Sequence, residues 1–238
     1  MKLAIMQPYF FPYLGYFQLI HASDKFVFYD DVNFIRNGWI NRNRLLLGAE
    51  PHYFTVPLAG ASSFASIRET HFDATNTRWK RKMLATFEAA YKRSPERDAG
   101  LQLLEKTLAA DTDLIGELAR RSVRNVMEYL GLEREVVESS HAYANAQLKG
   151  TARVLDICRR EGADTYVNPP GGRELYDAAE FRAAGIELCF LESHFPPYAQ
   201  GDAAFVPGLS ILDAIMRCPR GALSGMLESY DVDHVPPR

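Results

Sequence analysis

Side chains able to do acid–base chemistry stand where two predicted strands near the N-terminus end. Residues 2–6 form an apolar run typical of a buried strand, and Gln7 follows it directly. A second run, residues 25–29, ends on Asp30 and Asp31. Ligands of open α/β sheets bind beyond the carboxyl ends of the strands, so these three polar side chains mark a candidate site.

The two adjacent carboxylates could act as a general base, hold a metal ion or bind sugar hydroxyl groups. Successive side chains of an extended chain point in different directions, so only one of the two can easily face a common pocket. The structural alternative is a turn in which Asp31 accepts backbone amide hydrogen bonds. We therefore predict a catalytic role for Asp30 or Asp31.

A cluster of cationic, aromatic and amide side chains follows the second strand. Arg42 offers a planar fork of donors for a phosphate or carboxylate, and Trp39 offers a stacking face. Asn43 can hydrogen-bond to hydroxyl or amide groups. We predict an anion-binding site here, with Arg42 among the catalytic residues. A basic surface loop is the alternative.

Later segments supply weaker candidates for ligand contact. Lys149 precedes a predicted helix start, where an anion can bind, although the first glycine of a Walker A loop is absent. Glycines after Asn168 would let backbone amides approach a ligand, or would form a simple tight connection. Asp213 lies on an apolar helix face and needs a partner such as the backbone or Arg42. The remaining ligand-binding candidates are Tyr16, Gly171, Gly172, Gln200 and Ser210.

Several kinds of chemistry have no support in the sequence. The six histidines are scattered without metal-ligand spacing, and we predict no metal site. Cys158, Cys189 and Cys218 form no CxxC pair and are interpreted as buried free thiols. No GxSxG elbow is present, which argues against covalent serine catalysis. The sequence identifies no cofactor.

The composition limits the classes of binding partner that we expect. A formal net charge of −3 over 238 residues argues against a general nucleic-acid binder. No apolar run approaches the about 20 residues that a membrane helix needs, and Gln7 and Pro8 interrupt any signal-peptide pattern. We expect a cytoplasmic protein that binds a small molecule, such as a nucleotide sugar or another anionic ligand. A homo-oligomer is left open.

Strand-like and helical patterns alternate along most of the chain, which favours parallel pairing. Residues 76–130 change to three-to-four spacing of apolar residues and predict an inserted helical segment or lid. The tail from residue 231 is expected to fray. We therefore expect a single α/β domain over residues 1–238, an open, mostly parallel Rossmann-like sheet with helices on both faces. Further strands are predicted at 52–57, 66–72, 135–138, 165–167 and 186–191, and further helices at 150–161, 174–184 and 210–216.

Five segments together resemble the WbqC-like family: residues 4–16, 29–32, 39–43, 164–168 and 208–213. Some members of that family lie in bacterial surface-polysaccharide (O-antigen) gene clusters, and a glycine-transferase role has been suggested for one branch. The resemblance implies a transferase that moves a small acyl or amino-acid group, such as glycine, onto a sugar acceptor.

A more distant likeness concerns the turn after the first strand. Tyr13-Leu14-Gly15-Tyr16 is similar to the HxGH turn of nucleotidyltransferases, in which the imidazoles stabilise phosphate charge. Both histidine positions are tyrosine here, and a tyrosine is neutral at pH 7 and a weaker donor. The lost charge argues against the same chemistry and leaves nucleotide binding open.

The leading hypothesis assigns one role to each kind of residue. Asp30 or Asp31 would be the base, and Arg42, with Lys149 second, would contact the developing anion. The alternatives are a nucleotide-dependent transferase or ligase and a non-catalytic binding module for a sugar nucleotide or a partner protein. Gln7, Asn43 and Asn168 would orient the acceptor, and Tyr16 and Trp39 would stack on it.

Overall fold

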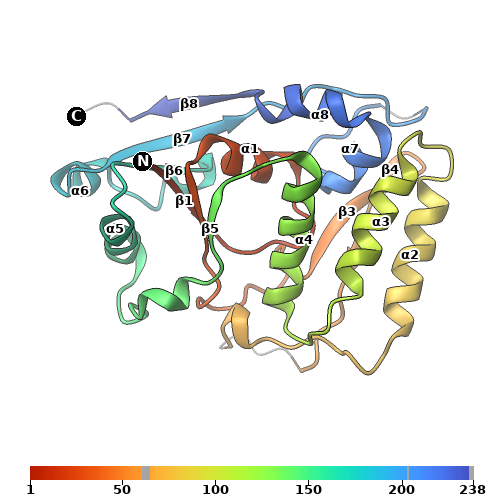
Figure 1. Ribbon diagram of the computed structural model, residues 1–238, viewed down its shortest axis with the longest axis horizontal. Helices are drawn as coiled ribbons and strands as arrows, with labels where there is room; N and C mark the ends of the chain where they lie inside the picture. The colour runs from red at the N-terminus through yellow and green to blue at the C-terminus, as the bar shows by residue number, and fades with distance from the viewer. Residues whose placement is uncertain (61–64, 203, 236–238) are drawn as a thin grey trace.

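Six strands form the central sheet of the computed structural model, which describes residues 1–60, 65–202 and 204–235 (Figure 1). All neighbouring strands are parallel except β7 and β8, which pair antiparallel. The expected α/β, mostly parallel Rossmann-like sheet is confirmed. The order is β5 (Glu135–Val137), β2 (Lys25–Phe28), β1 (Lys2–Met6), β6 (Thr165–Asn168), β7 (Glu187–Ser193) and β8 (Tyr230–His234).

Both faces of this sheet are covered, because its strands are apolar at successive positions. Leu3 and Ile5 point to a smaller core beneath α5 (Gly150–Glu161) and α6 (Ala178–Ala183). Ala4 points the other way, into a larger core. The helices with buried residues in that larger core are α1 (Leu14–Ala22), α2 (Arg78–Ala90), α3 (Arg97–Leu108), α4 (Ile115–Leu130), α7 (Ile211–Arg217) and α8 (Arg220–Leu227).

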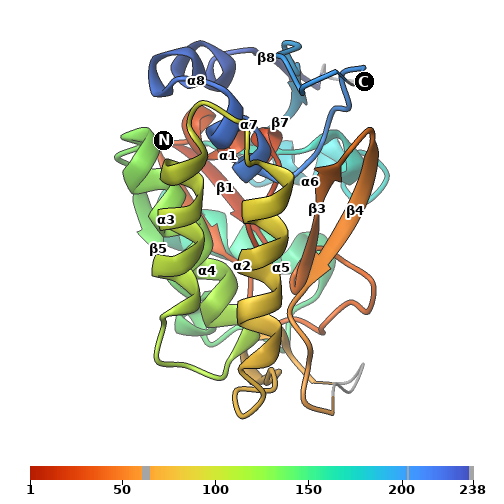
Figure 2. The ribbon, with the colours of Figure 1, turned by 90° about the vertical axis from the view of Figure 1, so that its right-hand side faces the viewer.

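The helical segment predicted at about 76–130 contains α2, α3 and α4, which lie side by side (Figure 2). Buried residues of each, such as Phe87, Leu104 and Leu118, join the larger core. A left-handed glycine, Gly131 at φ 72°, ends α4.

A two-stranded antiparallel sheet lies beside α2 (Figure 2). It consists of β3 (Arg42–Leu47) and β4 (Glu50–Thr55), and the rings of Phe54 and Phe87 meet at 4.9 Å. The strand predicted at 52–57 is therefore β4, outside the central sheet. β3 was not predicted, because its polar start was interpreted only as a binding cluster.

Two element predictions were wrong. Within residues 66–72, Ile67–Glu69 forms a short 3₁₀ helix, because Ser66 and Glu69 make a capping box in which the Ser66 backbone N–H donates to Glu69 Oε2 at 3.4 Å. The tail from residue 231 is not frayed along its described length. It forms most of β8, whose Val232 packs against the larger core.

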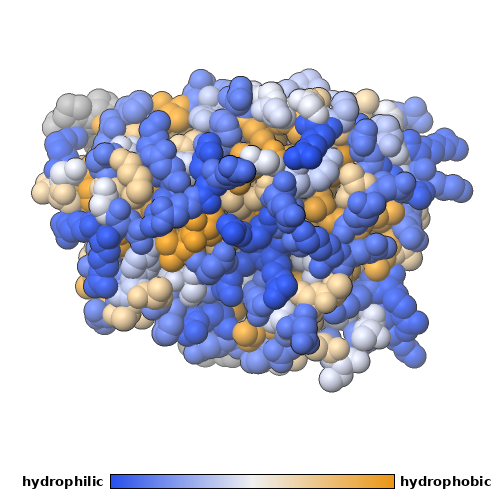
Figure 3. All heavy atoms as spheres, viewed as in Figure 1, coloured by the Kyte–Doolittle hydropathy of each residue, from blue (hydrophilic) through white to orange (hydrophobic). Residues whose placement is uncertain are grey.

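The face shown in Figure 3 is mainly hydrophilic, with apolar residues exposed only in patches. Within the described residues, none of the helices combines the length and apolar character needed to cross a bilayer.

Candidate ligand-binding site

The carboxyl edge of the parallel sheet gathers segments that are far apart in the sequence. The ends of β1 and β2 are level, since Met6 pairs with Phe28 and the Tyr29 amide donates to the Met6 carbonyl at 2.9 Å. Gln7, Asp30 and Asn168 end or follow β1, β2 and β6 at this edge. The sequence placed the strand ends correctly, so these residues share one edge of the fold.

A pocket of about 400 Å³ opens at this edge. Tyr9 and Tyr13 come from the turn after β1, and Phe195 follows β7. Burial raises the pKa of Tyr9 to about 12 and also raises the pKa of Tyr13, so both phenols are neutral at pH 7. We call this the aromatic pocket, and its lining residues are Tyr9, Tyr13, Trp39, Asn43, Phe195, Pro207 and Gly208.

Hydrogen bonds to backbone carbonyls hold two walls of the aromatic pocket together. The buried side chain of Asn43 donates from Nδ2 to the carbonyls of Phe10 at 3.3 Å and Phe11 at 2.8 Å. The Phe10 amide donates to the Trp39 carbonyl at 3.0 Å. Phe11 has φ 42°, a left-handed conformation that bends the chain so that both carbonyls meet Asn43. Of the predicted ligand-binding residues, Trp39 and Asn43 thus line one pocket.

Arg44 contacts two residues that line the aromatic pocket, Trp39 and Gly208. The sequence pattern did not single it out as a ligand-binding candidate. Its guanidinium lies 5.6 Å from the Trp39 ring centroid, and Nη2 donates to the Gly208 carbonyl at 3.1 Å. Its Nε is buried without a hydrogen-bond partner among the described residues. The alternation of Arg42 and Arg44 on a strand was the available signal, since residues two apart share a face.

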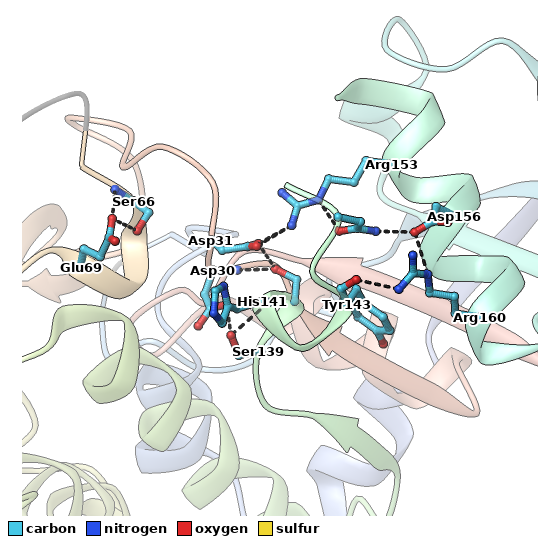
Figure 4. Close-up of polar contacts among 12 residues, drawn as sticks. Asp30, Asp31, Ser66, Glu69, Ser139, His141, Tyr143, Arg153, Asp156 and Arg160 are labelled. Carbon is cyan, nitrogen blue, oxygen red and sulfur yellow. Dashed lines mark hydrogen bonds and ion pairs between the residues drawn. The ribbon is translucent and has the colours of Figure 1, made fainter. Parts of the chain in front are cut away.

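Asp31 is bound by a buried arginine (Figure 4). Arg153 Nη2 donates to Oδ1 at 2.7 Å and to Oδ2 at 2.6 Å, and Ser140 Oγ donates to Oδ1. Arg153 also lies 4.8 Å from the Tyr29 ring centroid and donates from Nε to Asn145 Oδ1 at 3.0 Å. The donors to Asp31 are thus the side chains of Arg153 and Ser140, whereas the structural alternative to a catalytic role was a turn with backbone amide donors.

Asp30 is fully buried and has its own arginine. Arg120, from α4, forms an ion pair with Oδ2, and Ser139 Oγ donates to Oδ1 at 2.6 Å. Asp30 and Asp31 therefore point to different partners, as expected for adjacent residues of an extended chain. Ser139 and Ser140 follow β5, so three elements meet around the two carboxylates.

Arg42 and Tyr16 lie apart from the two carboxylates. Arg42 donates from Nε to the Gly38 carbonyl at 3.2 Å and its guanidinium lies 4.5 Å from the Tyr53 ring centroid. Tyr16 is buried in the core and donates to the Gln7 carbonyl at 2.9 Å. Burial holds the pKa of Tyr16 well above its ordinary value. Tyr16 thus fixes the end of β1 from within the core.

Asn168 packs against its own loop. It is buried, and Tyr166 donates to Oδ1 at 3.4 Å. A Cβ on Gly172 would lie 1.7 Å from Asn168 Nδ2, whereas a Cβ on Gly171 would meet nothing within 4 Å.

Lys149 is exposed at the start of α5.

Gln200, Ser210 and Asp213 do not line the aromatic pocket. Ser210 caps α7, accepting from the Leu212 amide at 3.3 Å and donating to the Phe11 carbonyl at 2.8 Å. The fully buried Asp213 accepts from Tyr91, Tyr198, Gln200 and Arg217 at 2.7–3.0 Å. The arginine expected beside Asp213 is therefore Arg217, in the next turn of the same helix.

Potential metal ligands gather at the β7–β8 edge, away from this pocket. Glu187, Cys189 and His234 have ligand atoms within 4.8 Å of one another. His234 Nδ1 lies 2.8 Å from Glu187 Oε1 and 3.4 Å from Cys189 Sγ. Burial raises the pKa of the Cys189 thiol to about 11. All three cysteines are buried and free, as the sequence analysis expected.

Comparisons with known proteins identify a family and a relative of similar sequence. A model of the WbqC-like protein family matches residues 7–224. The uncharacterised protein Rv1507c of Mycobacterium tuberculosis is 30% identical over 219 residues, which cover 91% of this chain and 93% of that relative. No solved structure matches the chain significantly.

Proposed function

The chain belongs to the WbqC-like protein family, and from that premise we propose that it is a transferase of bacterial surface-polysaccharide biosynthesis. In this proposal it moves a small acyl or amino-acid group, such as glycine, onto a sugar acceptor. The link of the family with polysaccharide biosynthesis supports the acceptor class.

The observation that carries the proposal is the aromatic pocket at the carboxyl edge of the sheet. Its volume of about 400 Å³ suits one sugar ring with part of its substituents. Trp39 and Tyr13 offer the apolar ring faces on which the C–H face of a sugar packs. Arg44, behind Trp39, supplies positive charge for an anionic group of the ligand.

Asp31 is the better base candidate of the two carboxylates. A carboxylate can accept about four hydrogen bonds, and Asp31 accepts three, from Arg153 and Ser140. The Asp30 side chain is 1% exposed against 6% for Asp31, so Asp31 is the more accessible of the two to an acceptor. Arg153 would hold the Asp31 carboxylate in one orientation.

The proposed step is an acyl transfer. The acceptor hydroxyl oxygen forms a bond to the acyl carbonyl carbon, and its proton passes to Asp31. The bond from the acyl carbon to the leaving group of an activated acyl donor then breaks, and the leaving group keeps the electron pair. Gln7, at the end of β1, would orient the acceptor.

Tryptophan fluorescence tests the pocket. The chain has two tryptophans, and Trp79 is buried in α2, so Trp79→Phe leaves Trp39 as the single reporter. Titration of this variant with a panel of nucleotide sugars should quench or shift its emission. Tyr13→Ala in the same background should weaken binding, whereas Tyr129→Ala, outside the pocket, should not. No response to any nucleotide sugar would count against a sugar-binding pocket.

Turnover distinguishes a transferase from a binding module. Incubation of acceptor with activated glycyl donors, followed by mass spectrometry, should reveal the acylated sugar. Asp31→Asn should abolish the product under conditions in which circular dichroism shows that the variant is folded. Ligand binding without product from any donor would favour the non-catalytic module instead.

A nucleotide-dependent transferase or ligase is the second candidate. One observation favours it: the Tyr13–Tyr16 turn begins α1 beside the aromatic pocket, and a Cβ on Gly15 would lie 2.6 Å from Ser193 Oγ. The start of α1 therefore lies against the end of β7, at the carboxyl edge of the sheet, and ligands of open α/β sheets bind beyond that edge. A thermal shift with Mg²⁺ and a nucleotide panel tests this candidate.

A further inference from the structure

A larger cavity, of about 690 Å³, lies between the tip of the β3–β4 hairpin, the end of α2 and residues 199–202. It shares no lining residue with the aromatic pocket. Arg217, from α7, and Gln200 also line it. We call it the basic cavity.

The charge of the basic cavity is opposite in sign to that of the whole chain. Its charged lining residues are Lys92, Arg93 and Arg217 against Asp202, three cations and one anion, whereas the chain has a formal net charge of −3. Lys92 and Arg93 are exposed at its mouth. Such a local excess of positive charge attracts anions.

Arg217 is held in place before any ligand arrives. Its side chain is 11% exposed, its Nε donates to Asp213 Oδ1 at 3.0 Å and its guanidinium lies 5.1 Å from the Tyr91 ring centroid. Neither Nη makes a hydrogen bond to a residue in the described part of the chain. The two Nη groups therefore remain available to an incoming acceptor.

The charge of Asp213 offsets that of Arg217, so the excess positive charge of the basic cavity comes from Lys92 and Arg93 against Asp202. Asp213 is already satisfied by Tyr91, Tyr198 and Gln200 besides Arg217. Burial and the Asp213 charge raise the pKa of both tyrosines, which stay neutral donors. The network fixes the orientation of the guanidinium and leaves its outer edge free, because one arginine offers five donors in a rigid fork.

Small residues make up part of the cavity wall. The lining includes four alanines and two glycines, and the glycines, Gly48 at φ 62° and Gly201 at φ 74°, turn the chain. A Cβ on Gly201 would lie 3.9 Å from Arg217 Nη1, so the loop passes close to the guanidinium.

We propose that the basic cavity binds a phosphate-bearing small molecule. Arg217 binds the phosphate through its Nη groups, because a guanidinium matches the geometry of phosphate oxygens. Lys92 and Arg93 add charge at the mouth, and Asp202 opposes binding. The site is separate from the proposed acyl transfer and does not depend on it.

Calorimetry with inorganic pyrophosphate as the probe tests the proposal on the full chain at low salt. Binding should occur at one site per chain, weaken as salt is added, and fall at least about tenfold in Lys92→Ala/Arg93→Ala. Asp202→Asn should bind the probe more tightly. Lys82→Ala, which removes an exposed lysine of α2 outside the cavity, is the matched control and should bind as wild type does.

Two further variants locate the binding. Arg217→Lys keeps the charge and loses the fork, and should weaken pyrophosphate binding while the fold, checked by circular dichroism, persists. Trp39→Ala should leave the binding unchanged. Absence of binding, equal affinity in the Lys92/Arg93 double variant, or loss of binding in Trp39→Ala would each overturn the proposal, the last by placing the anion in the aromatic pocket.

Discussion

Arg153 of α5 donates hydrogen bonds to both carboxylate oxygens of Asp31 at the end of β2, at 2.7 and 2.6 Å (Figure 4). The two side chains are 3% and 6% exposed. The pair therefore joins a helix on one face of the sheet to a strand end at its carboxyl edge, with little solvent to screen it.

Asp31→Asn should destabilise the fold strongly. The substitution leaves Arg153 as a buried charge without its counter-ion, which costs about 3–5 kcal/mol when a buried pair loses one partner. Asp98→Asn is the matched control, because its pair with Arg97 is exposed and such pairs contribute roughly 0–1 kcal/mol. Urea unfolding of both variants measures the difference, and equal losses would contradict the role of Arg153.

The sequence was sufficient for the strand ends but insufficient for the partners of the acidic residues. Continuous apolar runs such as residues 2–6 mark buried parallel strands, and the ends of parallel strands must share an edge. Arg120 and Arg153 lie about 90 and 122 residues from their carboxylates, inside helices whose pattern only signals an amphipathic surface. A local pattern cannot say which buried cation meets which carboxylate.

The residues predicted as one cluster at 39–43 do not all line the same pocket, for a related reason. Trp39 and Asn43 reach the aromatic pocket, whereas Arg42 turns back to its own loop and the Tyr53 ring. For Arg42 and Asn43 the strand decides this, because neighbouring residues of β3 point to opposite faces. Trp39 precedes β3, and its ring stacks on that of Tyr53. The face of a strand could not be assigned before the strand itself was recognised.

Gly172→Ala should disturb the loop after β6, and Gly171→Ala should not. A Cβ at position 172 would lie 1.7 Å from Asn168 Nδ2, so the Asn168 side chain must leave its buried position. We expect a loss of about 1–3 kcal/mol for Gly172→Ala, as for other overpacked sites. The Gly171 position is open, and its variant serves as control. Thermal unfolding of the pair checks this, and matching midpoints would show that Asn168 moves without cost.

Asp213→Ala should destabilise the region between α2 and α7 more than the removal of any one of the side chains that donate hydrogen bonds to Asp213. Removing the buried carboxylate leaves Arg217 and two tyrosine hydroxyls unpaired, for which about 3–5 kcal/mol is expected. Tyr91→Phe keeps the carboxylate and removes one hydrogen bond, at about 0.5–1.5 kcal/mol. Asp202→Ala, an exposed acid, should change stability by no more than about 0.5 kcal/mol. Denaturant midpoints of the three variants should follow that order, and a reversed order would reject the network as a stabilising element.

Glu161 gives the clearest pH dependence. It accepts from Lys25 Nζ at 2.5 Å and from Tyr143 at 2.5 Å, with its side chain 15% exposed. Burial acts to raise the pKa of Glu161, but these two donors outweigh it, so its pKa lies below the ordinary 4.5. The folded state therefore binds this proton less readily than the unfolded state, and the stabilisation is present above pH 4.5 and lost as pH falls through the lowered pKa.

Glu161→Gln should consequently be less stable than wild type at pH 7 by about 1.5–3 kcal/mol, since a charged hydrogen-bonded acceptor is lost. The difference should shrink as the pH is lowered toward 3, where Glu161 of the wild type is itself protonated. Glu174→Gln, with an exposed side chain, is the control and should follow wild type at both pH values. Urea unfolding at the two pH values measures both differences, and a Glu161→Gln deficit that stays constant would mean that the charge of Glu161 does not stabilise the contact between α5 and β2.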